Sequence, residues 1–387
     1  MKPRILVFLH YYLPGVRSGG PLQSIRYLTE ALGDEFSFDI VTLDRDKGDI
    51  SAYPGIVPNE WNTVGRARVL YLSPDRLGIY SLLRLLSSEE ADCLYVNSFF
   101  ARQFSMVPML GWLLGTNAQR AVVLAPRGEF SLGAVGLKAR RKRLFIGIAG
   151  LLPSYRRVVW HASTVSERAD IHREFGTEAK VRVAMEIAAP GSPVSACEMR
   201  TDKIPGSLRV VFLSRIVEKK NLLGALHALS GVIGDVEFNV YGPAEDPVYL
   251  SKCRQAIAQL PGNISVTVRP EVANAQVPAI FAAHHVFLFP TLGENYGYVI
   301  GEALAAGCPV ILSDQTPWQG LQGAGAGWNI PLGQPEIFRM AVQRYVDMTL
   351  GEFQEASAAA RKFAVDFSRR SDVVAENRSL FRAVACG

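Results

Sequence analysis

The sequence predicts an α/β protein with two tandem domains, each containing a parallel β-sheet covered by helices. Short apolar runs alternate with helical periodicities through both halves of the chain, a pattern typical of parallel sheets. The length of 387 residues exceeds the roughly 250–300 residues at which a single core stops growing. Residues 188–195, extending loosely to Pro205 and Gly206, are rich in Pro, Gly and Ser, as expected of a linker. We therefore expect a domain over residues 1–190, a linker over 191–206 and a second domain over 207–366.

The first half begins with an apolar run at residues 5–10, which predicts the first strand. An amphipathic helix is predicted at 22–32, because its apolar residues stand at 22, 25, 28 and 32. The apolar segment at 106–115 is predicted to be a core helix, since crossing a bilayer takes roughly 20 residues. Further strands are predicted at residues 38–43, 69–72, 93–96 and 121–125.

The alternation restarts after the linker. Strands are predicted at residues 209–213, 237–241, 264–268, 286–289 and 310–312, with helices from about 221, 247, 277 and 299. Helical patterns follow at 335–349 and 352–367, before a final segment at 372–384. We expect residues 367–387 to form a C-terminal helix that packs back on the N-terminal domain.

The composition is that of an ordinary globular protein, with 49% hydrophobic and 20% charged residues. The five cysteines are scattered and form no C-x-x-C pair, so neither a zinc site nor a disulfide framework is expected. A reducing cytoplasm fits this cysteine usage best, and no signal peptide is visible.

The mild net charge of +5 is unevenly distributed. Five cations cluster just before an apolar Leu-Phe-Ile run, and they are Lys138, Arg140, Arg141, Lys142 and Arg143. One interpretation is a solvated helix face. The other is a surface for anionic lipid headgroups or a phosphorylated acceptor. No base-stacking or groove-reading motif accompanies the cluster, so nucleic acid is not the expected partner.

The most informative stretch places Glu294 and Glu302 around a glycine turn at Gly297. A buried strand at 286–289 ends at Pro290, and a helix is predicted to start near residue 299. The stretch therefore lies at the carboxyl end of a strand, where open α/β sheets bind ligands and where a helix N-terminus favours an anion. Because one helical turn rises about 5.4 Å, the two carboxylates can hold separate parts of one elongated ligand.

Two further groups follow predicted strands. Arg215 and Lys220 lie between a strand and a helix, and cations placed there suit a diphosphate, although a solvent-facing loop is the alternative. Gly19 and Gly20 follow the first strand and allow close backbone approach to a ligand, or else form a simple turn.

Three residues of the first domain are weaker candidates on the acceptor side. Arg127 and Glu129 follow the strand at 121–125, and His161 lies near the end of another predicted strand, where a buried structural histidine is the alternative. Asp44 and Asp46 match an Asp-x-Asp metal pattern that is frequent by chance, and no metal site is expected.

Together these residues resemble the retaining glycosyltransferases of family 4, which have the GT-B fold of two Rossmann-like domains facing across a cleft. The family signature, two glutamates separated by seven residues and preceded by an Arg and a Lys, matches Glu294, Glu302, Arg215 and Lys220. Other similar elements are Gly19-Gly20, the 126–130 segment, Gly242-Pro243, Pro290 and the 301–310 segment. The chain departs from the family at Arg127, where a histidine is common, and at residues 185–191, where many members have a Pro-Asn-Gly turn.

The resemblance implies roles for these residues. Glu302 would accept hydrogen bonds from the ribose hydroxyls of a nucleotide sugar, and Glu294 would contact the transferred sugar. Arg215 and Lys220 would neutralise the leaving diphosphate. The backbone N–H groups that would help hold the sugar and diphosphate are those of Asn295, Tyr296, Gly297, Tyr298 and Val299.

The expected function is therefore transfer of a hexose from a UDP- or GDP-linked sugar to a glycan acceptor, with retention of configuration. The basic segment motivates a lipid-linked acceptor, cell-surface polysaccharide biosynthesis (lipopolysaccharide or exopolysaccharide) and a peripheral position at the inner face of the membrane. No cofactor and no metal are expected. Two alternatives stay open, a nucleotide-sugar epimerase of the same fold and a non-catalytic nucleotide-sugar-binding subunit.

Overall fold

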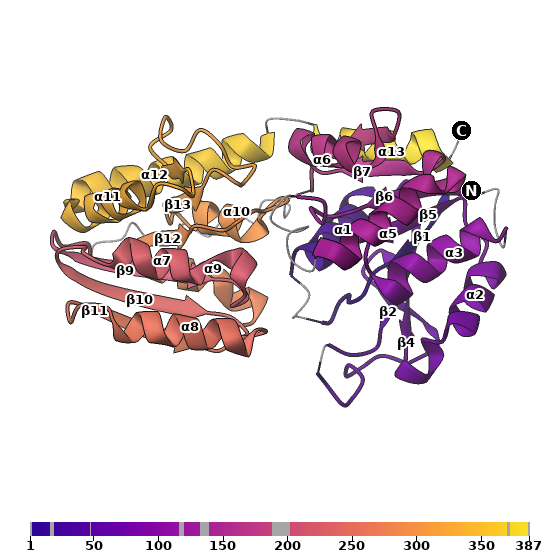
Figure 1. The fold of residues 1–387 in the computed structure, drawn as a ribbon, viewed down its shortest axis with the longest axis horizontal. Coiled ribbons are helices and arrows are strands. Elements are labelled where there is room, and N and C mark those ends of the chain that lie inside the picture. Colours follow the sequence, from indigo (N-terminus) through magenta and orange to yellow (C-terminus); the bar gives the residue numbers. More distant parts are fainter. Residues whose placement is uncertain are drawn as a thin grey trace. The chain divides into compact units, whose positions relative to one another are not determined.

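The chain divides into two compact units in a computed structural model, whose elements are drawn in Figure 1. Unit 1 comprises Met1–Pro190 together with Asp372–Gly387, and unit 2 comprises Gly191–Ser371. The structure describes residues 2–15, 19–46, 48–115, 120–131, 139–187, 202–369 and 372–385. Most of the expected linker over 191–206 lies outside these ranges, as do Lys138 and the side chain of Arg140.

The described part of unit 1 contains an eight-stranded sheet in the order β3-β4-β2-β1-β5-β6-β7-β8. All neighbours are parallel except the β3–β4 pair, which is antiparallel. The strands are β1 (Arg4–Phe8), β2 (Ser37–Leu43), β3 (Trp61–Val64), β4 (Ala67–Leu72), β5 (Cys93–Asn97), β6 (Ala121–Ala125), β7 (Val159–Ala162) and β8 (Lys180–Val183). The helices are α1 (Gly20–Leu32), α2 (Ile79–Ser88), α3 (Val107–Leu113), α5 (Ala139–Leu151), α6 (Val165–Phe175) and α13 (Val373–Ala385), with short turns η1 (Pro74–Arg76), η2 (Arg102–Met106) and η3 (Pro153–Arg156).

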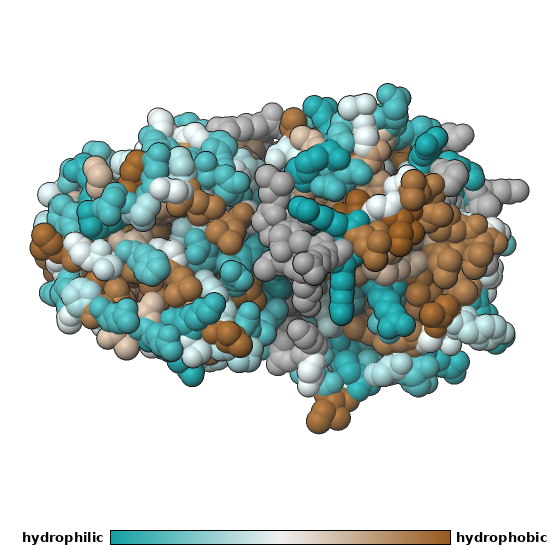
Figure 2. Space-filling view, in the orientation of Figure 1, coloured by the Kyte–Doolittle hydropathy of each residue, from teal (hydrophilic) through white to brown (hydrophobic). Residues whose placement is uncertain are grey.

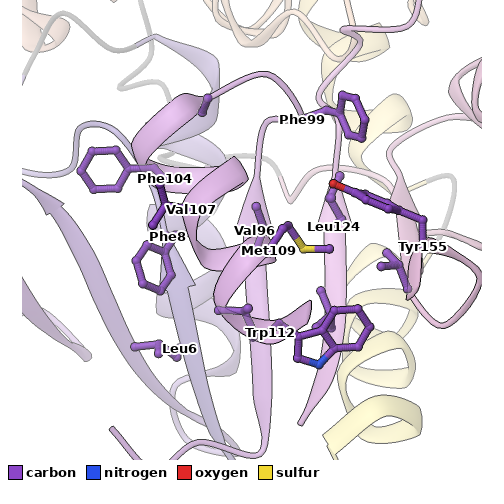
Figure 3. Close-up of a cluster of buried hydrophobic side chains, with 14 of the residues drawn as sticks. Leu6, Phe8, Val96, Phe99, Phe104, Val107, Met109, Trp112, Leu124 and Tyr155 are labelled. Carbon is purple, nitrogen blue, oxygen red and sulfur yellow. The ribbon is translucent and has the colours of Figure 1, made fainter. Parts of the chain in front are cut away.

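The core of unit 1 forms because its central strands are apolar on both faces, as buried parallel strands require. Four of the five residues of β1 are fully buried. Figure 3 shows one side of this core, where Val107, Met109 and Trp112 of α3 point toward side chains of β1, β5 and β6. The helix predicted at 106–115 is therefore confirmed as α3, with its inner face in the core.

The last helix, α13, belongs to unit 1 although it is the last in the sequence. Its Phe381 is buried. The centroid of the Phe381 ring lies 6.0 Å from the ring centroid of Phe36, 6.2 Å from that of Phe38 and 5.1 Å from that of Tyr95. Arg378 Nε donates to Glu35 Oε1 at 2.7 Å. These contacts explain why the chain returns to unit 1, visible as a yellow helix among the magenta elements in Figure 1.

Unit 2 contains, within its described residues, a six-stranded parallel sheet in the order β11-β10-β9-β12-β13-β14. The strands are β9 (Ser207–Leu213), β10 (Asp235–Tyr241), β11 (Ile264–Arg269), β12 (Val286–Phe289), β13 (Val310–Ser313) and β14 (Gly327–Ile330). The helices are α7 (Leu222–Leu229), α8 (Pro247–Ala258), α9 (Val277–Ala283), α10 (Tyr298–Ala305), α11 (Pro335–Asp347) and α12 (Leu350–Arg369), with short turns η4 (Glu218–Lys220) and η5 (Asn274–Gln276). Two parallel-sheet α/β units confirm the predicted fold class.

The strand order of unit 2 brings the loops after β9 and β12 together at one edge of the sheet. The chain moves outward from β9 through β10 to β11, then returns to the other side of β9 with β12. The crevice outside the carboxyl ends of β9 and β12 is therefore the topological switch point, where open sheets of this kind bind ligands. Among the described residues, none of the helices has the length and apolar character needed to cross a membrane.

Candidate active site

The two loops at the switch point of unit 2 bring Lys220 and Glu294 into contact. Lys220 ends the turn η4 after β9, and Glu294 lies on the loop after β12. Lys220 Nζ donates to Glu294 Oε1 at 2.6 Å, and the side chains are only 13% and 10% exposed. Thr291 Oγ1 donates to the same carboxylate oxygen at 2.9 Å. An ammonium group has three donors, so this contact leaves Lys220 able to bind a further oxygen.

Backbone and side-chain bonds fix the two loops against each other. Asn221 adopts a left-handed conformation, φ 58°, which Asn tolerates better than most residues. Its side chain caps α7 by accepting from the Gly224 N–H at 3.1 Å, and it donates to the Pro290 carbonyl at 2.8 Å. The Leu292 N–H donates to the Lys219 carbonyl at 2.9 Å. These hydrogen bonds between the loop after β9 and the loop after β12 fix the positions of Lys220 and Glu294 relative to each other.

The glycine turn after Glu294 starts α10. Gly297 has φ 81° and ψ 58° at the N-cap, and a Cβ there would lie 2.8 Å from Ile300 Cδ1. Only glycine therefore suits this position without strain. No side chain caps the helix, and its first turn carries no acidic residue. Trp318 Nε1 donates to the Tyr296 carbonyl at 2.7 Å and fixes the turn from the other side. The positive end of the helix dipole is thus available to an anion.

Glu302 lies one turn inside α10, as predicted. Its surroundings differ from those of Glu294, which has a lysine as its partner. Its side chain is half-buried, and burial raises the pKa of its carboxyl to about 7. Within the described part of the chain, no hydrogen bond or ion pair compensates this carboxylate. A group that loses water without gaining a partner favours its neutral form.

Arg215 occupies the same edge of the sheet but has a different partner. Its Nη1 donates to Glu245 Oε2 at 3.2 Å, and the Arg215 side chain is 48% exposed. The loop that carries Glu245 follows β10 and is bonded to the loop after β9, since the Ile216 N–H donates to the Pro243 carbonyl at 2.9 Å. Gly242 packs so closely that a Cβ would meet the Ser214 carbonyl oxygen at 2.1 Å. The loops after β10, β9 and β12, three neighbouring strands of the sheet, therefore converge at the switch point.

The predicted residues of unit 1 fall into two groups. Gly19 and Gly20 are exposed at the start of α1, where Gly19 has φ 59° and is the N-cap. Arg127, by contrast, is buried, with its side chain 7% exposed. It pairs with Glu186, which is 4% exposed, and its Nη2 donates to Asn97 Oδ1 at 2.8 Å.

His161 lies at the end of a directed chain of hydrogen bonds. Its Nε2 faces the Ala184 carbonyl oxygen at 2.9 Å and therefore carries the proton. Its Nδ1 then accepts from the Tyr95 hydroxyl at 2.7 Å, and that hydroxyl accepts from Arg127 Nη2 at 2.8 Å. Burial, together with the Arg127 charge, lowers the pKa of His161 to about 4. A neutral histidine with both nitrogens bonded favours the structural alternative.

Two further carboxylates of unit 1 bind backbone N–H groups. Glu129 accepts from the Phe99 N–H at 2.6 Å, and from the Ser98 hydroxyl at 2.7 Å, although burial still raises its pKa. Glu167 accepts from the Gly128 N–H at 2.6 Å. An acceptor-side role for Arg127, Glu129 and His161 stays a prediction, while their contacts within unit 1 favour a structural one.

The sequence patterns did not predict that Arg127 has a buried ion-pair partner, Glu186. For Glu186 the sequence held one signal, because it lies in the 185–191 segment, which departs from the pattern of the family that the sequence resembles, as Arg127 does. Burial alone would raise the pKa of Glu186, but Arg127 and the Ser24 and Ser163 hydroxyls lower it. The two departures therefore compensate each other through a direct ion pair.

Comparisons with known proteins agree with this architecture. Residues 207–347 match the family model described as glycosyl transferases group 1. No curated protein matches the sequence. The fold is similar to that of sucrose-phosphate synthase from Thermosynechococcus elongatus (TM-score 0.73, 16% identity, 100% of each chain covered). It is also similar to HepE from Anabaena, solved in complex with UDP and glucose (TM-score 0.67, 14% identity, 100% of each chain covered).

A third similar structure is the UDP-forming α,α-trehalose-phosphate synthase of Burkholderia xenovorans in complex with glucose-6-phosphate (TM-score 0.68, 14% identity, 100% of each chain covered). These likenesses establish the GT-B fold over the whole chain. The family match over unit 2 and this fold together support a glycosyltransferase of GT-B type.

Proposed function

We propose that this protein is a retaining glycosyltransferase, similar to family 4, that moves a hexose from a nucleotide sugar to a glycan acceptor. The observation that carries the proposal is the buried Lys220–Glu294 pair beside the uncapped start of α10. At the switch point, Lys220 is a cation that can bind a diphosphate, and Glu294 is a fixed carboxylate that can accept hydrogen bonds from sugar hydroxyls. The N-terminus of α10 lies at the same place.

Each residue has a task in the proposed reaction. Glu294, oriented by Lys220 and Thr291, accepts hydrogen bonds from hydroxyls of the transferred sugar. Glu302 accepts from the ribose hydroxyls, which supply the partners that its carboxylate lacks. Lys220 and Arg215 neutralise the diphosphate as the anomeric C–O bond breaks, with help from the backbone N–H groups of residues 295–299.

The cations also bear on the metal requirement. Charge that develops on a leaving diphosphate needs positive partners, and Arg215, Lys220 and the start of α10 supply them. We therefore propose a reaction that needs no divalent ion, with no cofactor. Activity that survives removal of divalent ions by EDTA would support this part of the proposal, and loss of activity restored by Mg²⁺ or Mn²⁺ would contradict it.

UDP-linked sugars are the first donors to test. HepE was solved with UDP and glucose, and the trehalose-phosphate synthase is described as UDP-forming. The basic cluster motivates a lipid-linked acceptor, cell-surface polysaccharide biosynthesis and a peripheral position at the cytoplasmic face of a membrane. The cysteines Cys93, Cys253 and Cys308 are buried and form no disulfide, which fits a reducing compartment.

A thermal-shift screen of UDP, GDP and ADP sugars tests donor binding. A ligand at about 100 times its dissociation constant should stabilise unit 2 by about 2.7 kcal/mol. Lys220→Met should abolish that shift, whereas Lys252→Met, an exposed lysine on α8, should preserve it. If none of the nucleotide sugars shifts the transition, the proposed function is wrong.

Product analysis separates the alternatives. Mass spectrometry of the sugar nucleotide after incubation detects an epimerised donor, which would favour the epimerase. The anomeric configuration of a transferred hexose, read by NMR, decides between retention and inversion. Binding without turnover on any acceptor or water would favour the non-catalytic subunit.

A further inference from the structure

Helix α5 of unit 1 is apolar on two different sides. Ile146 and Ala149 face the core and are 4% and 2% exposed. Leu144, Ile148 and Leu151 are instead 67%, 52% and 84% exposed. At 3.6 residues per turn, this i, i+4, i+7 spacing puts the three exposed side chains in a stripe about 60° wide. The helix therefore has one apolar face more than packing within unit 1 uses.

The exposed apolar surface continues beyond α5. Leu110 and Leu114, at the outer side and end of α3, are 41% and 66% exposed, while Trp112 of the same helix is buried. The Arg157 guanidinium lies 5.4 Å from the centroid of the Trp112 ring, so α3 neighbours the segment that follows α5. Figure 2 shows hydrophobic residues gathered over α5 and α3 on one face of unit 1. Patches of this kind mark interaction sites.

The segment of the sequence that carries α5 contains cations and no acid. No Asp or Glu occurs between Glu129 and Glu167, a stretch that contains seven lysines and arginines. Of these, Arg141, Arg143 and Arg156 are exposed. The combination of exposed aliphatic side chains and one-signed charge complements an anionic surface with an apolar layer beneath it.

We propose that α5 and the end of α3 form a docking surface for anionic phospholipid membranes, with Leu144, Ile148 and Leu151 inserted below the headgroups. Protein hot spots are rich in Trp, Tyr and Arg that fill pockets, whereas this surface exposes Leu and Ile in a stripe, which favours a bilayer as the occupant. The inference deepens the proposed function and rests on it, because a membrane at unit 1 delivers a lipid-linked acceptor.

Vesicle flotation of the full-length protein tests the surface. The probes are phosphatidylcholine vesicles with and without phosphatidylglycerol, at low and at high salt. We expect binding only to the anionic vesicles, and weaker binding as salt screens the arginines. Leu144→Ser/Ile148→Ser/Leu151→Ser should reduce partitioning about 100-fold or more. Its matched control, Ile233→Ser/Met340→Ser, changes residues of unit 2 that are 79% and 65% exposed and should bind as wild type does.

A charge series makes the same test independently. Arg141→Gln/Arg143→Gln should lower partitioning about 25-fold, since each cation near an anionic surface contributes about fivefold. The control Lys252→Gln/Arg254→Gln removes the same charge from exposed positions of α8 and should have little effect. Absence of binding to anionic vesicles, or equal binding by the serine variant and wild type, would overturn the proposal.

Two further readouts keep the outcomes apart. If light scattering shows a wild-type dimer that the serine variant dissociates, the surface joins two copies of the chain and the membrane proposal is wrong. UDP binding, measured on the same variants without vesicles, should be unchanged. Failure of flotation with intact UDP binding contradicts only the docking surface, whereas flotation without any nucleotide binding contradicts only the proposed function.

Discussion

Replacing Glu302 by glutamine should stabilise the ligand-free protein by an amount that grows with pH. Burial raises the pKa of this carboxyl from an ordinary 4.5 to about 7. Between these values the folded protein holds a proton that the unfolded chain has released, so the free energy of unfolding falls as pH rises. The penalty is absent below about pH 4.5 and complete above about pH 7. At about 1.4 kcal/mol for each pKa unit, it amounts to about 3 kcal/mol.

Urea denaturation at pH 5 and pH 8 measures this effect. Glu302→Gln should be about 3 kcal/mol more stable than wild type at pH 8 and about 1 kcal/mol more stable at pH 5. Glu355→Gln on α12 is the matched control, because Glu355 is exposed, and its difference from wild type should be the same at both pH values. A stability difference for Glu302→Gln that is equal at pH 5 and pH 8 would refute the reasoning that burial without a partner controls this group.

The same carboxyl should couple proton release to donor binding. Ribose hydroxyls that donate to Glu302 favour its charged form, so a bound nucleotide lowers its pKa. UDP affinity should therefore rise with pH and level off above about pH 7. Isothermal titration calorimetry in buffers of different ionisation enthalpy reads the proton directly. A wild-type affinity that is independent of pH would place the ribose elsewhere.

Three other substitutions test the remaining contacts. Lys220→Met should destabilise unit 2 by about 3 kcal/mol because it leaves Glu294 without its cation, and Lys220→Met/Glu294→Gln should recover most of that stability in urea denaturation without recovering transferase activity. Gly297→Ala should cost about 1–2 kcal/mol for its positive φ and weaken UDP binding, since the turn at the start of α10 must shift. Arg127→Met should destabilise unit 1 by about 3–5 kcal/mol by stranding the buried Glu186, while the UDP affinity of unit 2, measured below the unfolding transition, should stay as in wild type.

Local sequence patterns predicted the elements that carry the site. The run at 286–289 is a buried strand and α10 starts one residue from its predicted position, because apolar runs, proline and a glycine turn are local signals. The strands β3, β8 and β14 were not predicted. Each has four residues with partly exposed or polar side chains at or near a sheet edge, so none carries a continuous apolar run.

The pairing of side chains could not be predicted from the same patterns. Lys220 and Glu294 are separated by 74 positions, and they meet only because β12 lies beside β9 instead of beside β11. Arg127 and Glu186 are separated by 59 positions, and their pairing requires that β6 and β8 lie on either side of β7 and end at the same edge of the sheet. Strand order is a property of the whole sheet, so a contact between two loop residues cannot be obtained from the spacing of either loop.

The fold gives Glu294 and Glu302 opposite electrostatic environments, and this difference bears on function. Glu294 has a lysine and a hydroxyl as partners, so its charge is compensated before any ligand arrives. Glu302 is half-buried without such a partner, so its charge costs stability until hydroxyl donors are supplied. Stability alone does not favour a carboxylate there, because glutamine would fill the same space without a charge. Under the proposed function the missing donors are the ribose hydroxyls, and the free-energy cost of the Glu302 charge falls only when a nucleotide is bound.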